Sequence, residues 1–365
     1  MPQLILHDEH QSAGARFAPY GEWALPEDYG DALQEYHAVR ERVGLADLSY
    51  QGNFLVTGSD RVAFLQGLIS NDMTLLSKER GIYSTLLTAK GRVVADFYLY
   101  PLSDGLLMEL EWANTAKTKE HLMRYRLRSQ VKIDPPPWGR ILISGPRSKS
   151  LLEALFKEAL PPTKERSLLE ITWGGFSLLC IKRSITGEED YHLYLSEEGI
   201  VPLWMELLSL GHDLGVLPVG QAALEILRIE AGKPRYGVDI DEHIIPVEAG
   251  LADEAISYTK GCFPGQEVVA RIKTYGHVNK HLYGMVLEGS ELPQREDKVF
   301  KGDKQMGWVT SAARSPYLGK VIAIGYLRPQ IAVPGTTVEV EVGNTRTTAQ
   351  ATPLPFYQRK NKTNA

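Results

Sequence analysis

The chain has 365 residues, of which 43% are hydrophobic and 23% charged, a composition typical of a globular protein with more than one core. The net charge of −5 excludes a strongly basic nucleic-acid-binding surface over the whole chain. Cys180 and Cys262 are the only cysteines, too few for a disulfide framework or for the thiolates that an iron–sulfur cluster usually takes.

Residues 1–14 lack the basic start and apolar core of a signal peptide, and no apolar run approaches the roughly 20 residues of a membrane span. We therefore expect a soluble, cytoplasmic protein with no membrane partner. His7 and His10 flank two acidic residues, which suggests metal ligands, but polar residues near a terminus are usually solvated. Because no confirming ligand set follows, we expect no metal.

Helix caps, alternating apolar residues and breaker residues divide the chain into elements. Asp31 fits the N-cap of one helix, and Gly232 stops another. Residues after 280 show only short strands and turns, which predicts an all-β C-terminal domain before a polar tail. The remaining pattern predicts a loop over 16–29, helices over 31–43, 62–68, 116–128, 148–159, 201–210 and 220–230, and strands over 53–58, 81–88, 92–102, 140–144, 171–182 and 191–195.

Asp96 is an unusual residue in the strand predicted over 92–102. It alternates with aromatic residues, where a carboxylate is depleted. Burying an unpaired charge is expensive, so this carboxylate is either an exposed edge residue or faces a pocket. We favour the pocket.

The basic helix predicted over 116–128 is followed at 134–139 by the strongest break in the chain, a candidate domain crossover. A run of basic residues on a helix usually forms a solvated face, and contact with phosphate or nucleic acid is the less common outcome.

Residues 260–267 concentrate more special residues than any other stretch. Two glycines and a proline define a tight turn, and a cation such as Lys260 near Cys262 favours a reactive thiolate. The alternative is an ordinary turn with a buried cysteine. The residues of interest in this motif are Lys260, Gly261, Cys262, Gly265, Gln266 and Glu267.

On the basis of this motif and several others, the chain resembles the glycine-cleavage T-protein (aminomethyltransferase, GcvT-like) superfamily over almost its full length. The 260–267 motif resembles the signature of its YgfZ branch. The supporting matches are residues 35–40, 44–49, 228–232, 236–240, 246–251, 309–311 and 315–316.

The resemblance implies an α+β protein with three domains in a cloverleaf, two ferredoxin-like α+β domains and a C-terminal β-barrel, around a central folate channel. We expect the second domain to be inserted into the first. The expected limits are 1–50 with 136–245 for the folate-binding first domain, 51–135 with 246–279 for the second, 280–357 for the barrel and 358–365 for the tail.

The resemblance also implies site residues. Asp96 matches the key carboxylate of the T-protein, and Asp96 and Cys262 are the candidate catalytic residues. His192 stands where the family has a glutamate that grips the pterin, which puts that recognition in doubt because a neutral imidazole offers one donor and one acceptor. The residues implied to bind the cofactor are Tyr83, Asp96, Tyr100, His192, Arg228 and Tyr236.

Three functions are compatible with this resemblance. The first is a YgfZ-like tetrahydrofolate-binding protein that supports iron–sulfur cluster assembly or repair and, indirectly, tRNA modification. The second is an aminomethyltransferase, in which Asp96 holds the amine while tetrahydrofolate or a substituted folate takes the one-carbon unit. The third is a non-catalytic folate sensor, and we rank the first function highest. We expect a monomer whose partners are a folate and either iron–sulfur assembly proteins or a lipoyl carrier protein, without direct contact to nucleic acid.

Overall fold

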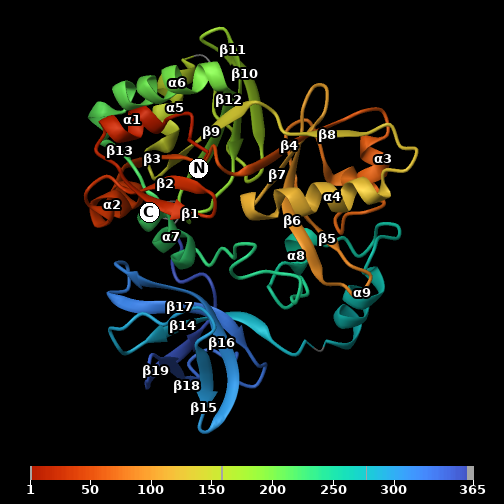
Figure 1. The fold of residues 1–365 in the computed structure, drawn as a ribbon, viewed down its shortest axis with the longest axis vertical. Coiled ribbons are helices and arrows are strands. Elements are labelled where there is room, and N and C mark those ends of the chain that lie inside the picture. The colour runs from red at the N-terminus through yellow and green to blue at the C-terminus, as the bar shows by residue number, and fades with distance from the viewer. Residues whose placement is uncertain (1, 158, 277, 360–365) are drawn as a thin grey trace, which may run out of the picture.

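The computed structural model describes residues 2–157, 159–276 and 278–359. Two layered α+β units lie beside one another above a β-barrel (Figure 1). The expected fold class is confirmed, because two open sheets with helices precede a closed barrel of six strands. The domain limits stay a prediction, and tail residues 360–365 lie outside the described residues.

The first unit is a six-stranded sheet in the order β10-β11-β12-β9-β3-β13, antiparallel except for the β3–β13 pair. The strand β9 is apolar on both of its faces because helices cover both faces of the sheet. Ile141 and Ile143 pack with α5 and α6, whereas Leu142 packs with α2 and α7. The strands are β3 (Val43–Asp47), β9 (Trp138–Ser144), β10 (Leu168–Trp173), β11 (Phe176–Lys182), β12 (Asp190–Ser196) and β13 (Val216–Pro218), and the helices are α2 (Ala32–Glu41), α5 (Ser148–Phe156), α6 (Glu197–Leu210) and α7 (Gln221–Glu230).

The second unit is a five-stranded antiparallel sheet in the order β5-β6-β7-β4-β8, formed by the chain between β3 and β9. One face carries the apolar core with Phe64, Leu65 and Leu122 from the covering helices. The opposite face presents Asp96 and Tyr98 to the interior of the molecule. The elements are β4 (Gly52–Thr57), β5 (Ile82–Leu87), β6 (Val93–Pro101), β7 (Leu106–Leu110), β8 (Lys132–Asp134), α3 (Arg61–Gln66) and α4 (Thr115–Tyr125).

The barrel closes because β14 pairs with both β17 and β19. Its interior is filled by apolar side chains such as Met285, Val309 and Val340, so the barrel is a packed core rather than a pore. Its strands are β14 (His281–Leu287), β15 (Lys298–Lys301), β16 (Lys304–Ser315), β17 (Lys320–Leu327), β18 (Thr337–Val342) and β19 (Thr345–Thr352).

The structure confirms the predicted helices α2 and α7, and Asp31 accepts two N–H bonds as the N-cap of α2. Two predictions were wrong. Residues 16–29 are not a loop but a hairpin, which tolerates its prolines because both of its strands are edges. The single strand predicted over 171–182 is two strands, because Gly174 and Gly175 turn the chain with positive φ angles.

None of the helices among the described residues is long and apolar enough to cross a membrane. The elements not yet named are small and lie outside the two sheets and the barrel. They are α1 (His7–Ser12), β1 (Arg16–Tyr20), β2 (Trp23–Asp28), η1 (Met73–Leu75), η2 (Trp112–Asn114), η3 (His212–Leu214), α8 (Ala252–Ala255) and α9 (Gln266–Tyr275).

Candidate functional site

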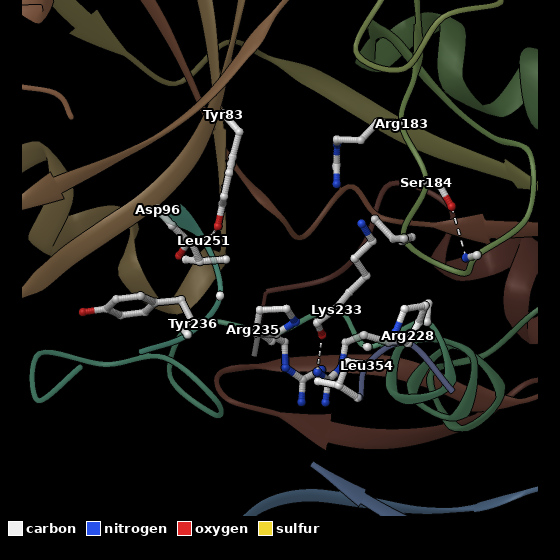
Figure 2. A pocket seen from close by; sticks show the side chains of 18 of the residues that line it. Tyr83, Asp96, Arg183, Ser184, Arg228, Lys233, Arg235, Tyr236, Leu251 and Leu354 are labelled. Carbon is white, nitrogen blue, oxygen red and sulfur yellow. Dashed lines mark hydrogen bonds between the residues drawn. The ribbon is translucent and has the colours of Figure 1, made fainter. Parts of the chain in front are cut away.

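A cavity of about 1180 Å³ lies between the two sheets, the loop after α7 and the C-terminal segment that follows the barrel. Of the residues predicted to bind a cofactor, the structure brings Tyr83, Asp96, Arg228 and Tyr236 to its wall. Figure 2 shows Tyr83 and Asp96 on one side of this cavity, with charged side chains on the others.

Tyr83 and Asp96 form a pair on neighbouring strands. The register of β5 and β6 places Tyr83 opposite Tyr98 and Thr85 opposite Asp96, so Tyr83 and Asp96 are diagonal neighbours. The Tyr83 hydroxyl donates to Asp96 Oδ2 at 2.7 Å, and Oδ1 has no partner among the described residues. Burial raises the pKa of Asp96 to about 6. This carboxylate therefore retains an acceptor for a ligand and can change its charge near neutral pH.

Arg228 also lines the cavity, but its donors are already used. Its five N–H groups serve the Glu225 carboxylate, Asp239 Oδ2, the Lys233 carbonyl and the Ser311 hydroxyl. Burial works against its charged form, but Asp239 and Glu225 raise its pKa. Arg228 therefore holds the loop after α7 against the barrel, and only the face of its guanidinium remains for a ligand.

Tyr100 and His192 differ from the expectation, since neither is among the described residues that line the cavity. Tyr100 is fully buried between the two sheets, packed with Tyr194 of the first unit. His192 is fully buried and accepts from Arg140 Nη2 at 2.8 Å through Nδ1 while its Nε2 donates to the Arg183 carbonyl. Burial and the Arg140 charge lower its pKa. The imidazole is therefore neutral, and both of its nitrogens are occupied.

The 260–267 motif is a structural clamp. The Lys260 ammonium donates to the carbonyls of Gln66, Ile69 and Asn71 at 2.7, 2.7 and 2.9 Å, so its three hydrogens point into the second unit. Burial lowers the pKa of Lys260 to about 8. This arrangement differs from the prediction that Lys260 activates Cys262, which is exposed and outside the described cavity wall.

The rest of the motif shapes the turn before α9. Gly265 is the N-cap with a φ of 81°, and a Cβ there would lie 2.6 Å from the Thr88 carbonyl oxygen, so glycine is required. Gln266 donates to the Lys260 carbonyl, and Glu267 lies in the first turn of α9. Gly261 has open space around its Cα. No cluster of His, Cys, Asp or Glu within residues 2–157, 159–276 and 278–359 is arranged to hold a metal.

Sequence reasoning missed an ionic cluster on the inner wall, formed by Glu109, Arg140 and Arg183. Glu109 Oε1 lies 2.9 Å from Arg140 Nη2 and also accepts from Arg183, while Oε2 accepts from the Tyr194 hydroxyl at 2.6 Å. Burial opposes ionisation, but the two guanidinium groups lower the pKa of Glu109. The signal was present, because Glu109 interrupts an otherwise apolar strand as Asp96 does.

These features define a class, a small-molecule-binding protein whose α+β units and barrel enclose an ionisable carboxylate. Residues 6–260 match the GCVT N-terminal domain family, and residues 280–358 match the glycine cleavage T-protein C-terminal barrel domain. The chain belongs to this glycine-cleavage T-protein family.

Individual proteins of this family match the chain over nearly its full length. The aminomethyltransferase of Halothermothrix orenii is 32% identical over 98% of this chain and 100% of its own, and that of a Geobacillus species is 32% identical over 96% and 97%. The structure of the glycine cleavage system aminomethyltransferase T from Bartonella henselae superposes with a TM-score of 0.90 at 23% identity, covering 98% of this chain and 99% of that one. The superfamily resemblance is confirmed, whereas these matches do not support the narrower YgfZ assignment.

Tetrahydrofolate is the one-carbon acceptor that aminomethyltransferases of this family use. The residues present fit such a group. Small-molecule pockets usually measure about 300–1,000 Å³, so a cavity of about 1180 Å³ has room for a folate and a second reactant. The rings of Tyr83, Tyr98 and Tyr236 offer stacking surfaces, and the orphaned Asp96 oxygen offers an acceptor.

Proposed function

We propose that this protein is an aminomethyltransferase that moves a one-carbon unit from an amine-bearing donor to tetrahydrofolate. The observation that carries the proposal is Asp96, a carboxylate in the wall of a large cavity that Tyr83 holds through Oδ2 and whose buried Oδ1 has no partner among the described residues. The named relatives support this reaction over the YgfZ-like function ranked first from the sequence.

The chain's own residues would act by position and charge. Bound tetrahydrofolate supplies the nitrogens that accept the one-carbon unit. Asp96, ionised above its pKa of about 6, orients the cationic amine of the donor and stabilises positive charge at the reacting carbon. Tyr83 fixes the carboxylate by donating to Oδ2.

We propose that the donor arrives on a lipoyl carrier protein. The test measures one-carbon transfer from an aminomethylated lipoyl carrier protein to tetrahydrofolate. Asp96→Asn keeps the shape of the side chain and its acceptor for Tyr83, so we expect transfer to fall ~100-fold or more through loss of charge alone. Asp104→Asn, an exposed change in the turn after β6, is the matched control and should leave the rate unchanged. A wild-type rate no higher than background would reject the proposal.

A second candidate is the YgfZ-like role in iron–sulfur cluster assembly or repair, with its indirect effect on tRNA modification. The exposure of Cys262 on the turn before α9 favours it, because a partner can reach this thiol. We expect a Cys262→Ala variant to bind tetrahydrofolate normally, since Cys262 lies apart from the described cavity wall. Iron–sulfur enzyme activity in cells that carry only this variant decides the matter, and undiminished activity rejects the second candidate.

A further inference from the structure

The described wall of the cavity carries six cationic side chains and six carboxylates, so the question is which cations lack a partner. Arg140 and Arg183 lie on the inner wall beside Glu109, and Lys233 and Glu165 also line the cavity. Arg140 and Glu109 form an ion pair with each other, and Arg140 also donates to His192. Glu165 accepts the Ser184 N–H at 3.1 Å.

Arg183 is the group that this pairing leaves incomplete. Its side chain is 7% exposed, its Nη2 donates to Glu109, and its guanidinium carbon lies 4.3 Å from the centre of the Tyr98 ring. Nε is buried without a partner, and no hydrogen bond engages Nη1 within the described part of the chain. An unsatisfied buried donor costs about 1–3 kcal/mol, and more when it is charged. The guanidinium is therefore held by one ion pair and by stacking, while Nε and Nη1 lack an acceptor among the described residues.

Lys233 supplies a second cation from the opposite side. Arg183 and Lys233 reach into the cavity from facing walls (Figure 2). The side chain of Lys233 makes no ion pair with the described residues, although its carbonyl accepts from Arg228, which fixes the start of the side chain. Arg183 and Lys233 are donor-only groups, so the space between them favours a ligand group that accepts hydrogen bonds.

We propose that Arg183 and Lys233 form a carboxylate-binding subsite of this cavity. A carboxylate between them would supply acceptors to Arg183 and a counter-ion to Lys233, with the fork of the guanidinium fixing its orientation. This inference rests on the proposed function, because it assigns a ligand group to the same cavity. The carboxylate has two possible sources, the glutamate portion of the folate or a free amino acid that donates the one-carbon unit in place of the carrier-bound amine, which has no carboxylate.

Calorimetry on the intact protein separates these sources. The ligands are tetrahydrofolate, tetrahydropteroate, which lacks the glutamate, and N-methylglycine. Arg183→Gln should weaken binding of the carboxylate-bearing ligand by ~10–100-fold, as expected for hydrogen bonds to a charged group, and Lys233→Met should weaken it by a smaller factor. Arg128→Gln, an exposed change, is the control and should have no effect.

A loss confined to tetrahydrofolate, with tetrahydropteroate unaffected, assigns the subsite to the folate tail. A loss confined to N-methylglycine assigns it to the donor. If both variants bind all three ligands with the affinities of wild type, the inference is overturned. If Arg183→Gln does not fold, Lys233→Met decides alone. If wild type binds N-methylglycine through Arg183 but transfers no one-carbon unit from the aminomethylated lipoyl carrier protein to tetrahydrofolate, the proposed function fails while the subsite stands.

Discussion

Replacing Asp96 by Asn should stabilise the protein at neutral pH while it abolishes function. Burial raises the pKa of Asp96 from 3.8 to about 6. Keeping the carboxylate ionised in the folded state therefore costs about 3 kcal/mol, at 1.36 kcal/mol per pKa unit. Asn carries no such cost, and its side-chain oxygen still accepts from Tyr83.

The sign of the pH dependence follows from proton linkage. Between pH 3.8 and about 6 the folded state keeps the Asp96 proton that the unfolded chain has lost. The stability that protonated Asp96 contributes is therefore present below pH 3.8 and is lost as the pH rises through about 6. Relative to wild type, Asp96→Asn should gain about 2 kcal/mol between pH 4 and pH 8, because a small part of the full effect of about 3 kcal/mol is already present at pH 4. A constant offset from the new amide group does not affect this difference.

Urea unfolding of both proteins from pH 4 to pH 8 measures this difference directly. Asp104→Asn removes an equal charge from an exposed turn and should track wild type at every pH. A stability difference between Asp96→Asn and wild type that stays flat across this range would show that Asp96 is not held in a desolvating site. The argument for an ionisable carboxylate in the cavity would then fail.

Three further changes test other parts of the structure. Lys260→Met removes a charged donor from three buried carbonyls and should lower the unfolding free energy by at least about 3 kcal/mol; a loss below 1 kcal/mol in urea unfolding would contradict the clamp. Tyr83→Phe removes the hydrogen bond that lowers the pKa of Asp96, so the midpoint in the pH profile of transfer should move upward from about 6. An unchanged midpoint would show that Tyr83 does not set the pKa of the group that controls transfer. Tyr357→Ala removes a ring that stacks 3.6 Å from the Arg40 guanidinium and should loosen the C-terminal segment beside the cavity. Folate release, measured by stopped flow, should then be faster by ~3-fold or more.

The sequence identified Asp96 because one carboxylate among alternating aromatic residues needs a special environment. It did not identify the cluster of Glu109, Arg140 and Arg183, because the partners are far apart in the chain. Glu109 and Arg183 are separated by 74 positions, and only the meeting of the two sheets pairs them. A motif also fixes a position without fixing the direction of its side chain. Lys260 and Cys262 are two residues apart, yet one is 7% exposed and turned inward while the other faces solvent.

The end of α7 explains how a cavity shared by three parts of the molecule keeps its shape. Arg228 joins the helix to Asp239 and to Ser311 of the barrel, and Glu230 accepts from Arg40 and Ser315. Removing one partner of such a buried pair leaves an uncompensated charge and costs about 3–5 kcal/mol. Arg183 lines the same cavity but takes no part in these bonds, because its own ion pair is with Glu109 between the two sheets. Ligand preference can therefore change at Arg183 without loosening the junction between the barrel and the α+β units, which is why we place the specificity of this chain there rather than at Arg228.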